Sequence, residues 1–287
     1  DVDRTCADTD GSGLAFSSGL CVAASMLRRS DWTSASACAG ACETADCCVA
    51  SSGGAVGELT NLRSTGADST NLEYASMLTM SPDGKHVYAM GQRSDTLVYW
   101  DRDAATGALT NQVNLKDKTN LEDIRGAAVS PDGKFLIAIG PSSNSLVYWN
   151  RDANTGDLTN QVNLIDSTNL KGGSRVTVSP DGKSIYATGQ VQSGTEPRLR
   201  VWDRDPVTGE LTNLITFDDS NLDNARNVIV SPDGKNVYVA AFLGEAIVYF
   251  DRDLATGALS NQINLKDTTN LDGANDLVIS PDGKNLY

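Results

Sequence analysis

The feature that most constrains the fold of this chain is a five-residue segment, Ser-Pro-Asp-Gly-Lys, that recurs at a nearly constant interval. It begins at residues 81, 130, 179, 231 and 280, so successive copies are 49, 49, 52 and 49 residues apart. A period of this length is typical of solenoids and propellers, in which each repeat buries its apolar surface against its neighbours. The sequence from residue 57 to residue 287 is therefore predicted to be a repeat domain.

Each repeat predicts four β-strands. In the repeat around Ser130, the apolar run GAAV precedes the motif, FLIAIG follows it, and LVYW and LTNQVNL come later. Such runs favour strands, and Pro-Asp-Gly between two of them favours a tight turn whose glycine has a positive φ. Thr-Gly pairs ending at residues 107, 156, 209 and 257 predict a second hairpin. The expected fold class is all-β, a β-propeller of four-stranded blades with about five blades visible, which is compatible with a larger ring.

The two ends of the repeat domain match different parts of one blade. Residues 57–63 (GELTNLR) resemble a fourth strand, and the sequence stops after the second strand of another repeat. Pairing of these ends would close a ring and remove open sheet edges. Both a five-blade ring and a larger ring remain open at this point.

All cysteines of the chain lie before residue 49. They are Cys6, Cys21, Cys38, Cys42, Cys47 and Cys48. An even number of cysteines in a short segment favours disulfides formed in an oxidising compartment, whereas a zinc site would usually include histidine. Residues 1–52 are therefore predicted to be a disulfide-stabilised segment of a secreted, extracellular or cell-surface protein, with a pairing that the sequence does not fix.

The charge of the chain limits its partners. The net charge is −14 and the isoelectric point is about 4.4. Nucleic acid and anionic membrane surfaces would repel such a chain, and no apolar run is long enough to span a membrane. Protein partners, or further copies of this chain in an extracellular assembly, are expected instead.

Polar residues just before the first strand of each blade are candidates for binding a small ligand at the mouth of the central channel. They are Arg125, Arg175, Arg226, Asn227, Asn275 and Asp276. Arginines at this position can bind a carboxylate or phosphate, or they can pair with acidic neighbours as a structural plug. The acidic neighbours are Glu122, Asp123, Asp223 and Asp276.

The loop between the second and third strands varies most among the repeats. Its longest copy, residues 190–198, is predicted to be a contact surface, because loops on a rigid scaffold often carry recognition. The candidate interaction residues there are Gln190, Gln192, Glu196 and Arg198.

No catalytic residue, metal site or cofactor is predicted. The Asp/Asn-Arg-Asp segments, such as residues 101–103, have carboxylates that can ligate calcium, but an aspartate before a tight turn more often caps backbone N–H groups. His86, the only histidine, follows a hairpin turn and is expected at the surface, without a role.

The segment SPDGKHVYAMGQRSDTLVYWDRDAATGALT resembles the repeat of lactonase-type propellers, which include bacterial phosphogluconolactonases and fungal carboxymuconate cyclases. It is also similar to the YVTN repeats of surface proteins. The resemblance covers residues 57–287 and implies a propeller, usually of seven blades. In catalytic members, a His-Pro-His-Ser stretch leads into the repeat motif and an Asp-Leu-Gly segment follows it, and this chain has neither. The positions of the missing histidine are Ser76, Arg125, Ser174, Arg226 and Asn275.

Two functions follow from these observations. The first is a non-catalytic extracellular propeller that serves as a structural, adhesion or protein-interaction module in a cell-surface or filamentous assembly. The alternative is a divergent lactonase-like hydrolase that acts on a small sugar lactone at the channel mouth, with a carboxylate in place of the missing histidine.

Overall fold

The computed structural model of the protein describes residues 70–190 and 198–287. These residues belong to one unit, Thr65–Tyr287. The predicted disulfide segment at residues 1–52 lies outside the described residues, and so do the strand expected at residues 57–63 and the candidate interaction residues Gln192 and Glu196.

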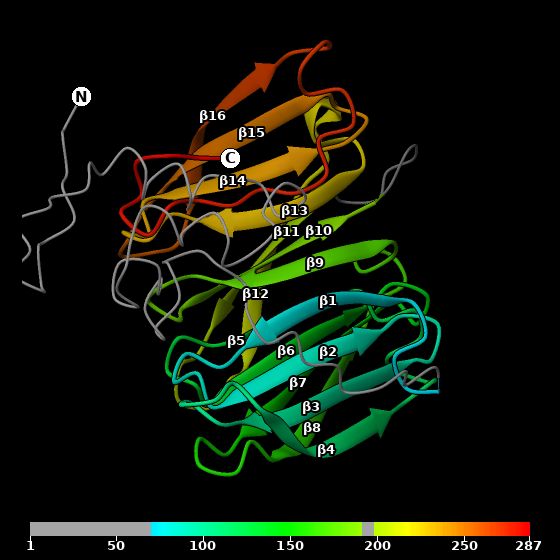
Figure 1. Cartoon of the computed structure of the whole chain (residues 1–287). Helices are drawn as coiled ribbons and strands as arrows, with labels where there is room; N and C mark the ends of the chain where they lie inside the picture. Colours follow the sequence, from blue (N-terminus) through cyan, green and yellow to red (C-terminus); the bar gives the residue numbers. More distant parts are fainter. Residues whose placement is uncertain (1–69, 191–197) are drawn as a thin grey trace, which may run out of the picture. The chain divides into compact units, whose positions relative to one another are not determined.

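The described residues form four antiparallel sheets of four strands each, which confirms the predicted propeller blades (Figure 1). The first strands are β1 (Ala75–Met80), β5 (Gly126–Val129), β9 (Gly173–Val178) and β13 (Ala225–Val230). The second strands are β2 (His86–Gly91), β6 (Phe135–Gly140), β10 (Ser184–Gly189) and β14 (Asn236–Ala241). The third strands are β3 (Thr96–Arg102), β7 (Ser145–Arg151), β11 (Leu199–Arg204) and β15 (Ala246–Arg252). The fourth strands are β4 (Leu109–Lys116), β8 (Leu158–Ile165), β12 (Leu211–Phe217) and β16 (Leu259–Lys266).

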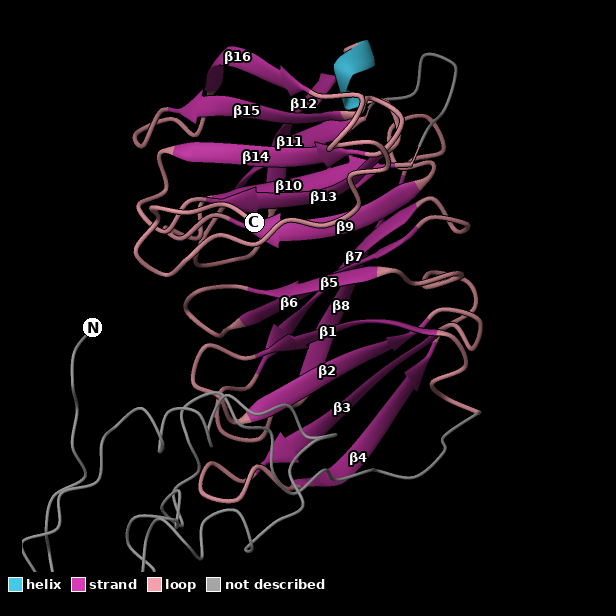
Figure 2. Ribbon diagram, turned by 45° about the horizontal axis from the view of Figure 1, so that its top comes forward, coloured by secondary structure: helices cyan, strands magenta, loops and turns pink. Residues whose placement is uncertain are grey.

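The first strands of successive blades lie side by side. β1 contacts β5, β5 contacts β9, and β9 contacts β13, as Figure 2 shows. A short 3-10 helix, η2 (Ser220–Leu222), precedes β13, and a bridge between Ile279 and Leu286 begins a further blade. Within the described part of the protein, no helix has the length and apolarity to cross a membrane.

The Ser-Pro-Asp-Gly-Lys segments form the turns between the first and second strands, as predicted. In the first copy, the Ser81 hydroxyl donates to Asp83 and accepts from the backbone N–H of His86. Gly84 has a φ of 69°, which an L side chain adopts only at a cost. The same bonds recur in the later copies, so turn chemistry fixes where each hairpin reverses.

Burial follows the position of a strand in its blade. All six residues of β6 are buried, because the second strand is covered by neighbouring blades on both faces. The fourth strand lies at the outer edge, and most residues of β8 are exposed. This difference explains why the second strands are mostly apolar, whereas β4, β8 and β16 carry the polar pattern Thr/Ser-Asn-Gln.

Three arginines of the Asp/Asn-Arg-Asp segments contact the preceding blade within the described residues: Arg151, Arg204 and Arg252. Arg151 donates through Nη1 to the carbonyl oxygen of Gly133 at 2.7 Å and through Nε to the hydroxyl of Tyr88, in the preceding blade, at 2.6 Å. The second aspartate caps the following turn, since Asp152 accepts from the backbone N–H of Thr155 at 3.0 Å. The aspartate therefore caps the turn, as expected. Within residues 70–190 and 198–287, no group of three or more His, Cys, Asp or Glu side chains is placed to hold a metal ion.

His86 is buried between the first two blades, so the expectation of a surface position was wrong. Its exposed fraction is 2%, and its ring packs against Gly156, where a Cβ atom would come within 2.3 Å of it. Arg151 Nη2 lies 2.5 Å from Nδ1 of the ring, and Asp101 Oδ1 lies 3.5 Å from Nε2. Burial, and after it the charge of Arg151, lowers the pKa of His86. The sequence around His86 does not reveal this environment, because it depends on a glycine of the next blade.

Candidate ligand-binding site

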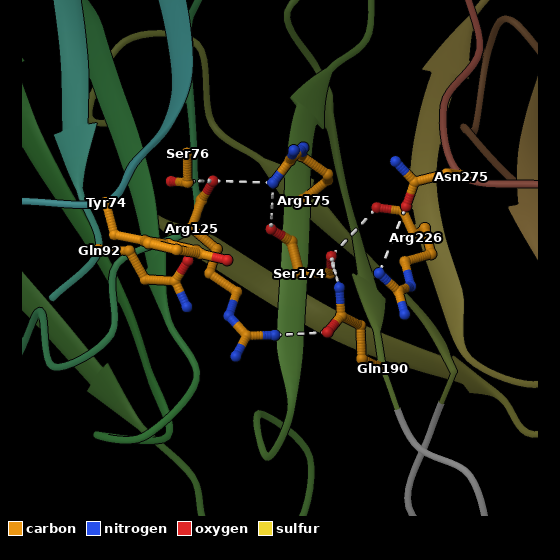
Figure 3. A pocket seen from close by; sticks show the side chains of 9 residues that line it. All are labelled: Tyr74, Ser76, Gln92, Arg125, Ser174, Arg175, Gln190, Arg226 and Asn275. Carbon is orange, nitrogen blue, oxygen red and sulfur yellow. Dashed lines mark hydrogen bonds between the residues drawn. The ribbon is translucent and has the colours of Figure 1, made fainter. Parts of the chain in front are cut away.

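One pocket lies where the first strands begin, at the end of the blades opposite the Ser-Pro-Asp-Gly-Lys turns. Its volume is about 340 Å³. The residue five positions before each motif serine lines it, in all five repeats, and Figure 3 shows these side chains together. The lining residues are Tyr74, Ser76, Gln92, Arg125, Ser174, Arg175, Gln190, Arg226 and Asn275. Equivalent positions of different blades thus converge on one site, as expected around a propeller axis.

A left-handed residue precedes the first strand of every repeat and turns the backbone towards this site. It stands seven positions before the motif serine. The five residues are Tyr74 (φ 56°), Asp123 (φ 62°), Gly172 (φ 66°), Asn224 (φ 52°) and Gly273 (φ 73°). Glycine adopts this conformation freely, whereas an L side chain raises its energy by about 1–2 kcal/mol. Tyr74 and Asp123 therefore carry backbone strain beside the pocket, where such strain is often functional.

A glycine allows the first strands of the second and third blades to approach closely. A Cβ atom at Gly126 would lie 3.0 Å from Cα of Arg175 and 3.0 Å from the carbonyl oxygen of Ser174. Other blades have a side chain at this position, and Arg175 is one of them. The small residue at 126 therefore makes room for the backbone that carries Arg175 into the pocket.

The guanidinium group of Arg125 is held from two sides. Its Nη2 donates to Asp123 Oδ2 at 2.7 Å, and its Nη1 donates to the amide oxygen of Gln190. The Asp123 carboxylate also accepts from the Gln92 amide. Among the described residues, Nε of Arg125 is buried with no hydrogen-bond partner. The side chain is thus fixed in direction but retains an unused donor.

The other two arginines have no carboxylate within ion-pairing distance among the described residues. Arg175 donates to the carbonyl oxygen of Arg125 at 2.9 Å. Arg226 donates to the Asn275 side chain at 3.3 Å and lies over the Phe242 ring, with its guanidinium carbon 4.3 Å from the ring centroid. Nε of Arg226 is buried, and no described residue accepts from it. Of the three arginines, Arg125 alone forms, within the described residues, the acidic pairing that a structural plug would need.

Every charged residue among the described residues that line the pocket is an arginine, in a protein whose net charge is −14. Burial lowers the pKa of Arg175, Asp276 opposes this effect, and the neighbouring charges of Arg125 and Arg226 add to it. Burial and then Arg125 also lower the pKa of Arg226. Like charges held this close, with unused donors, are stabilised by a bound anion. We call the site formed by Arg125, Arg175 and Arg226 the arginine mouth.

The structure brings together four of the six residues predicted as ligand-binding: Arg125, Arg175, Arg226 and Asn275. The other two, Asn227 and Asp276, lie beside the pocket and bond to each other. The sequence did not identify Tyr74 as a site residue. The signal that identifies it is its register, seven positions before the motif.

The candidate interaction residues that the structure describes do not form an exposed contact surface. Gln190 lies in the pocket, where its amide nitrogen donates to the Ser174 hydroxyl at 2.9 Å. Arg198 was expected on an exposed loop but is buried, and it pairs with Asp223 and donates to the carbonyl oxygen of Asp218. Gln190 and Gln92 both stand eleven positions after the serine of their motif. This shared position in the repeat is the sequence signal from which both could have been predicted to line the site.

Comparisons with known proteins agree on the fold. A family model described as "Lactonase, 7-bladed beta-propeller" matches residues 47–170 and 161–267. A Bacteroides uniformis protein assigned as a 6-phosphogluconolactonase superposes with a TM-score of 0.55 at 22% identity, over 70% of this chain and 59% of its own. The periplasmic gluconolactonase of Pseudomonas aeruginosa gives 0.54 at 19% identity, over 70% and 55%. The hydrazine synthase of Kuenenia stuttgartiensis gives 0.54 at 22% identity, over 79% and 58%.

At identities of 19–22%, these likenesses show the fold alone. The chain spans 55–59% of the length of the three structures. No curated protein sequence matches it significantly. Because the family model matches most of the chain, including the repeats that form the arginine mouth, this chain belongs to the lactonase family of seven-bladed β-propellers.

Proposed function

We propose that this protein is a lactonase-like hydrolase whose arginine mouth binds a small anionic sugar lactone. The observation that carries the proposal is the convergence of three guanidinium groups on one pocket, two of them with buried Nε donors that no described residue satisfies. Bidentate donors of this kind suit a carboxylate or a phosphate. The pocket volume of about 340 Å³ suits a single sugar ring.

Two relatives support the choice of a lactone. The names of the Bacteroides uniformis and Pseudomonas aeruginosa proteins both refer to lactones of gluconic acid or its phosphate. The predicted role as a structural or adhesion module rests on the regularity of the blades. The arginine mouth gives no support for that role. Secretion and the N-terminal disulfides remain predictions and are compatible with either role.

The residues present can support hydrolysis of such a lactone. Water adds to the lactone carbonyl carbon, the ring C–O bond breaks, and the ring oxygen takes up a proton to give a hydroxy acid. One arginine of the mouth would bind the anionic group of the substrate, and another would stabilise the negative charge that develops on the carbonyl oxygen. We assign Asp123 as the base that takes the proton from water, because it bonds to two lining residues, Gln92 and Arg125.

The test combines binding and turnover. Arg125→Ala, Arg175→Ala and Arg226→Ala are each expected to weaken binding of gluconate and 6-phosphogluconate by about 10- to 100-fold, since a hydrogen bond to a charged group contributes about 1.5–3 kcal/mol. Lys134→Ala removes the same charge from an exposed turn at the opposite end of the blade and should leave affinity unchanged. Calorimetric titration measures both.

Turnover is followed as acid release from glucono-δ-lactone and 6-phosphogluconolactone, with spontaneous hydrolysis subtracted. Asp123→Asn should lower kcat by a larger factor than it lowers the affinity for gluconate, because it removes the base but only weakens the support of Arg125. Equal affinities for the arginine variants and Lys134→Ala would refute the anion site. Binding without any acceleration of hydrolysis would refute the enzyme while leaving the anion site in place.

A further inference from the structure

Tyr74 is held in an unfavourable backbone conformation that packing does not explain. It stands at the left-handed position of its repeat, with a φ of 56°, where two other repeats have glycine. A large L side chain rarely adopts this conformation. Yet the exposed fraction of Tyr74 is 64%, so burial of its ring does not offset the strain.

The ring of Tyr74 nevertheless has a defined place. The backbone of Tyr74 is bonded to the loop after β2. The carbonyl oxygen of Tyr74 accepts from the backbone N–H of Gln92 at 3.3 Å, and the carbonyl oxygen of Glu73 accepts from the backbone N–H of Arg93 at 3.1 Å. The guanidinium carbon of Arg93 lies 4.8 Å from the centroid of the Tyr74 ring. These contacts hold an aromatic ring at the rim of the pocket without enclosing it.

The lining of the pocket therefore differs from side to side. Figure 3 shows Tyr74, Gln92 and Arg125 on one side and Arg226 and Asn275 on the other. Tyr74 is the only aromatic residue among those that line the pocket in the described part of the protein. An anionic ligand bound to the arginines would thus have one aromatic surface beside the rest of its body.

We propose that Tyr74 determines specificity for the ring form of the sugar: its aromatic ring packs against the C–H face of a cyclic ligand whose anionic group occupies the arginine mouth. This inference rests on the proposed function. A closed sugar ring presents a rigid patch of C–H groups that can pack on an aromatic face, whereas a linear acid must lose conformational freedom to do so. The lactone would then bind more tightly than the linear acid that its hydrolysis produces, which favours product release.

The test uses two anions of the same charge, methyl glucuronide with a locked ring and gluconate, which is linear. The full-length protein should bind the glucuronide more tightly than gluconate in calorimetric titration. Tyr74→Gly should weaken glucuronide binding by roughly 3- to 10-fold, with gluconate affinity unchanged, and Tyr74→Phe should retain the preference. Because glycine adopts a positive φ freely, Tyr74→Gly should also raise the urea midpoint of unfolding, which separates lost binding from lost folding.

Each other outcome overturns the inference in a recognisable way. If Tyr74→Gly binds the glucuronide as tightly as the unmodified protein, or loses affinity for both anions equally, the aromatic ring does not discriminate ring form, and the anion site stands. If the unmodified protein binds neither anion, the proposed function fails and the role of Tyr74 fails with it.

Discussion

Two arginines at equivalent positions of the repeat are expected to respond to substitution in opposite ways. Arg252 and Arg204 each donate through Nη1 to a glycine carbonyl oxygen of their own blade. Arg252 also donates through Nε to the hydroxyl of Tyr186 at 2.8 Å and through Nη2 to the Asp181 carboxylate at 2.9 Å. Arg204 instead lies over the ring of Phe135 at 4.3 Å, and its Nε and Nη2 are buried with no partner among the described residues.

The expected free energies follow from these partners. Arg252→Met breaks a part-buried ion pair with Asp181 and removes one hydrogen-bond partner of the fully buried Tyr186 hydroxyl, so the free energy of unfolding should fall by about 1.5–3 kcal/mol. Arg204→Met removes two unsatisfied donors, each of which costs about 1–3 kcal/mol, and keeps an apolar side chain against Phe135. The variant also loses the bond to the Gly182 carbonyl oxygen and the cation–π contact with Phe135, together about 2–3 kcal/mol, so the net change should lie between no effect and a stabilisation of about 3 kcal/mol.

Urea denaturation of the two variants and the unmodified protein, followed by tryptophan fluorescence, measures the difference. A double-mutant cycle of Arg252→Met with Tyr186→Phe should show coupling, because the two side chains share a hydrogen bond. The reasoning is refuted if Arg204→Met destabilises the protein as much as Arg252→Met does, since unsatisfied donors would then have no measurable cost.

Two further predictions concern other contacts between blades. The pKa of His86 is lowered in the folded state, so the unfolded protein takes up the proton more readily, and the free energy of unfolding should fall as the pH drops below about 6.5. His86→Phe, which copies the residue found at this position in the next repeat, should abolish that decrease in urea midpoints between pH 7.5 and 5. Gly126→Ala should destabilise the protein by about 1–3 kcal/mol and weaken anion binding, because the new methyl group would press on the backbone of Arg175. A Gly126→Ala variant with unchanged midpoint and affinity would contradict the close approach of β5 and β9.

The fold could be predicted from the sequence because its determinants are local and repeated. Each Ser-Pro-Asp-Gly-Lys turn satisfies its own backbone groups through the serine and aspartate side chains, so the motif alone places a hairpin. The alternation of buried second strands and exposed fourth strands likewise follows from composition. Four of the six predicted ligand-binding residues were found in one pocket because equivalent positions before the first strand share the propeller axis.

The parts that were missed depend on contacts between repeats. The burial of His86 requires Gly156 of the next blade, and nothing near residue 86 in the sequence indicates it. Arg198 is buried because Asp223, at the start of another blade, lies beside it. The position of Tyr74 depends on a left-handed backbone conformation, which two other repeats indicate by having glycine there. The sequence therefore reveals this conformation only when the residues seven positions before each motif serine are compared.

Nearly identical repeats can therefore produce a site that is itself not repeated. The positions that hold the turns are constant, whereas the position five residues before the motif varies from blade to blade. Its five occupants are Ser76, Arg125, Ser174, Arg226 and Asn275. Because the axis gathers this position into one pocket, substitutions there act on a shared set of charges and should be coupled. The charge of Arg125 contributes to the lowered pKa of both Arg175 and Arg226, which supports this expectation. Arg151, Arg204 and Arg252 each contact a different preceding blade, so the changes in free energy of unfolding caused by substituting them should be additive.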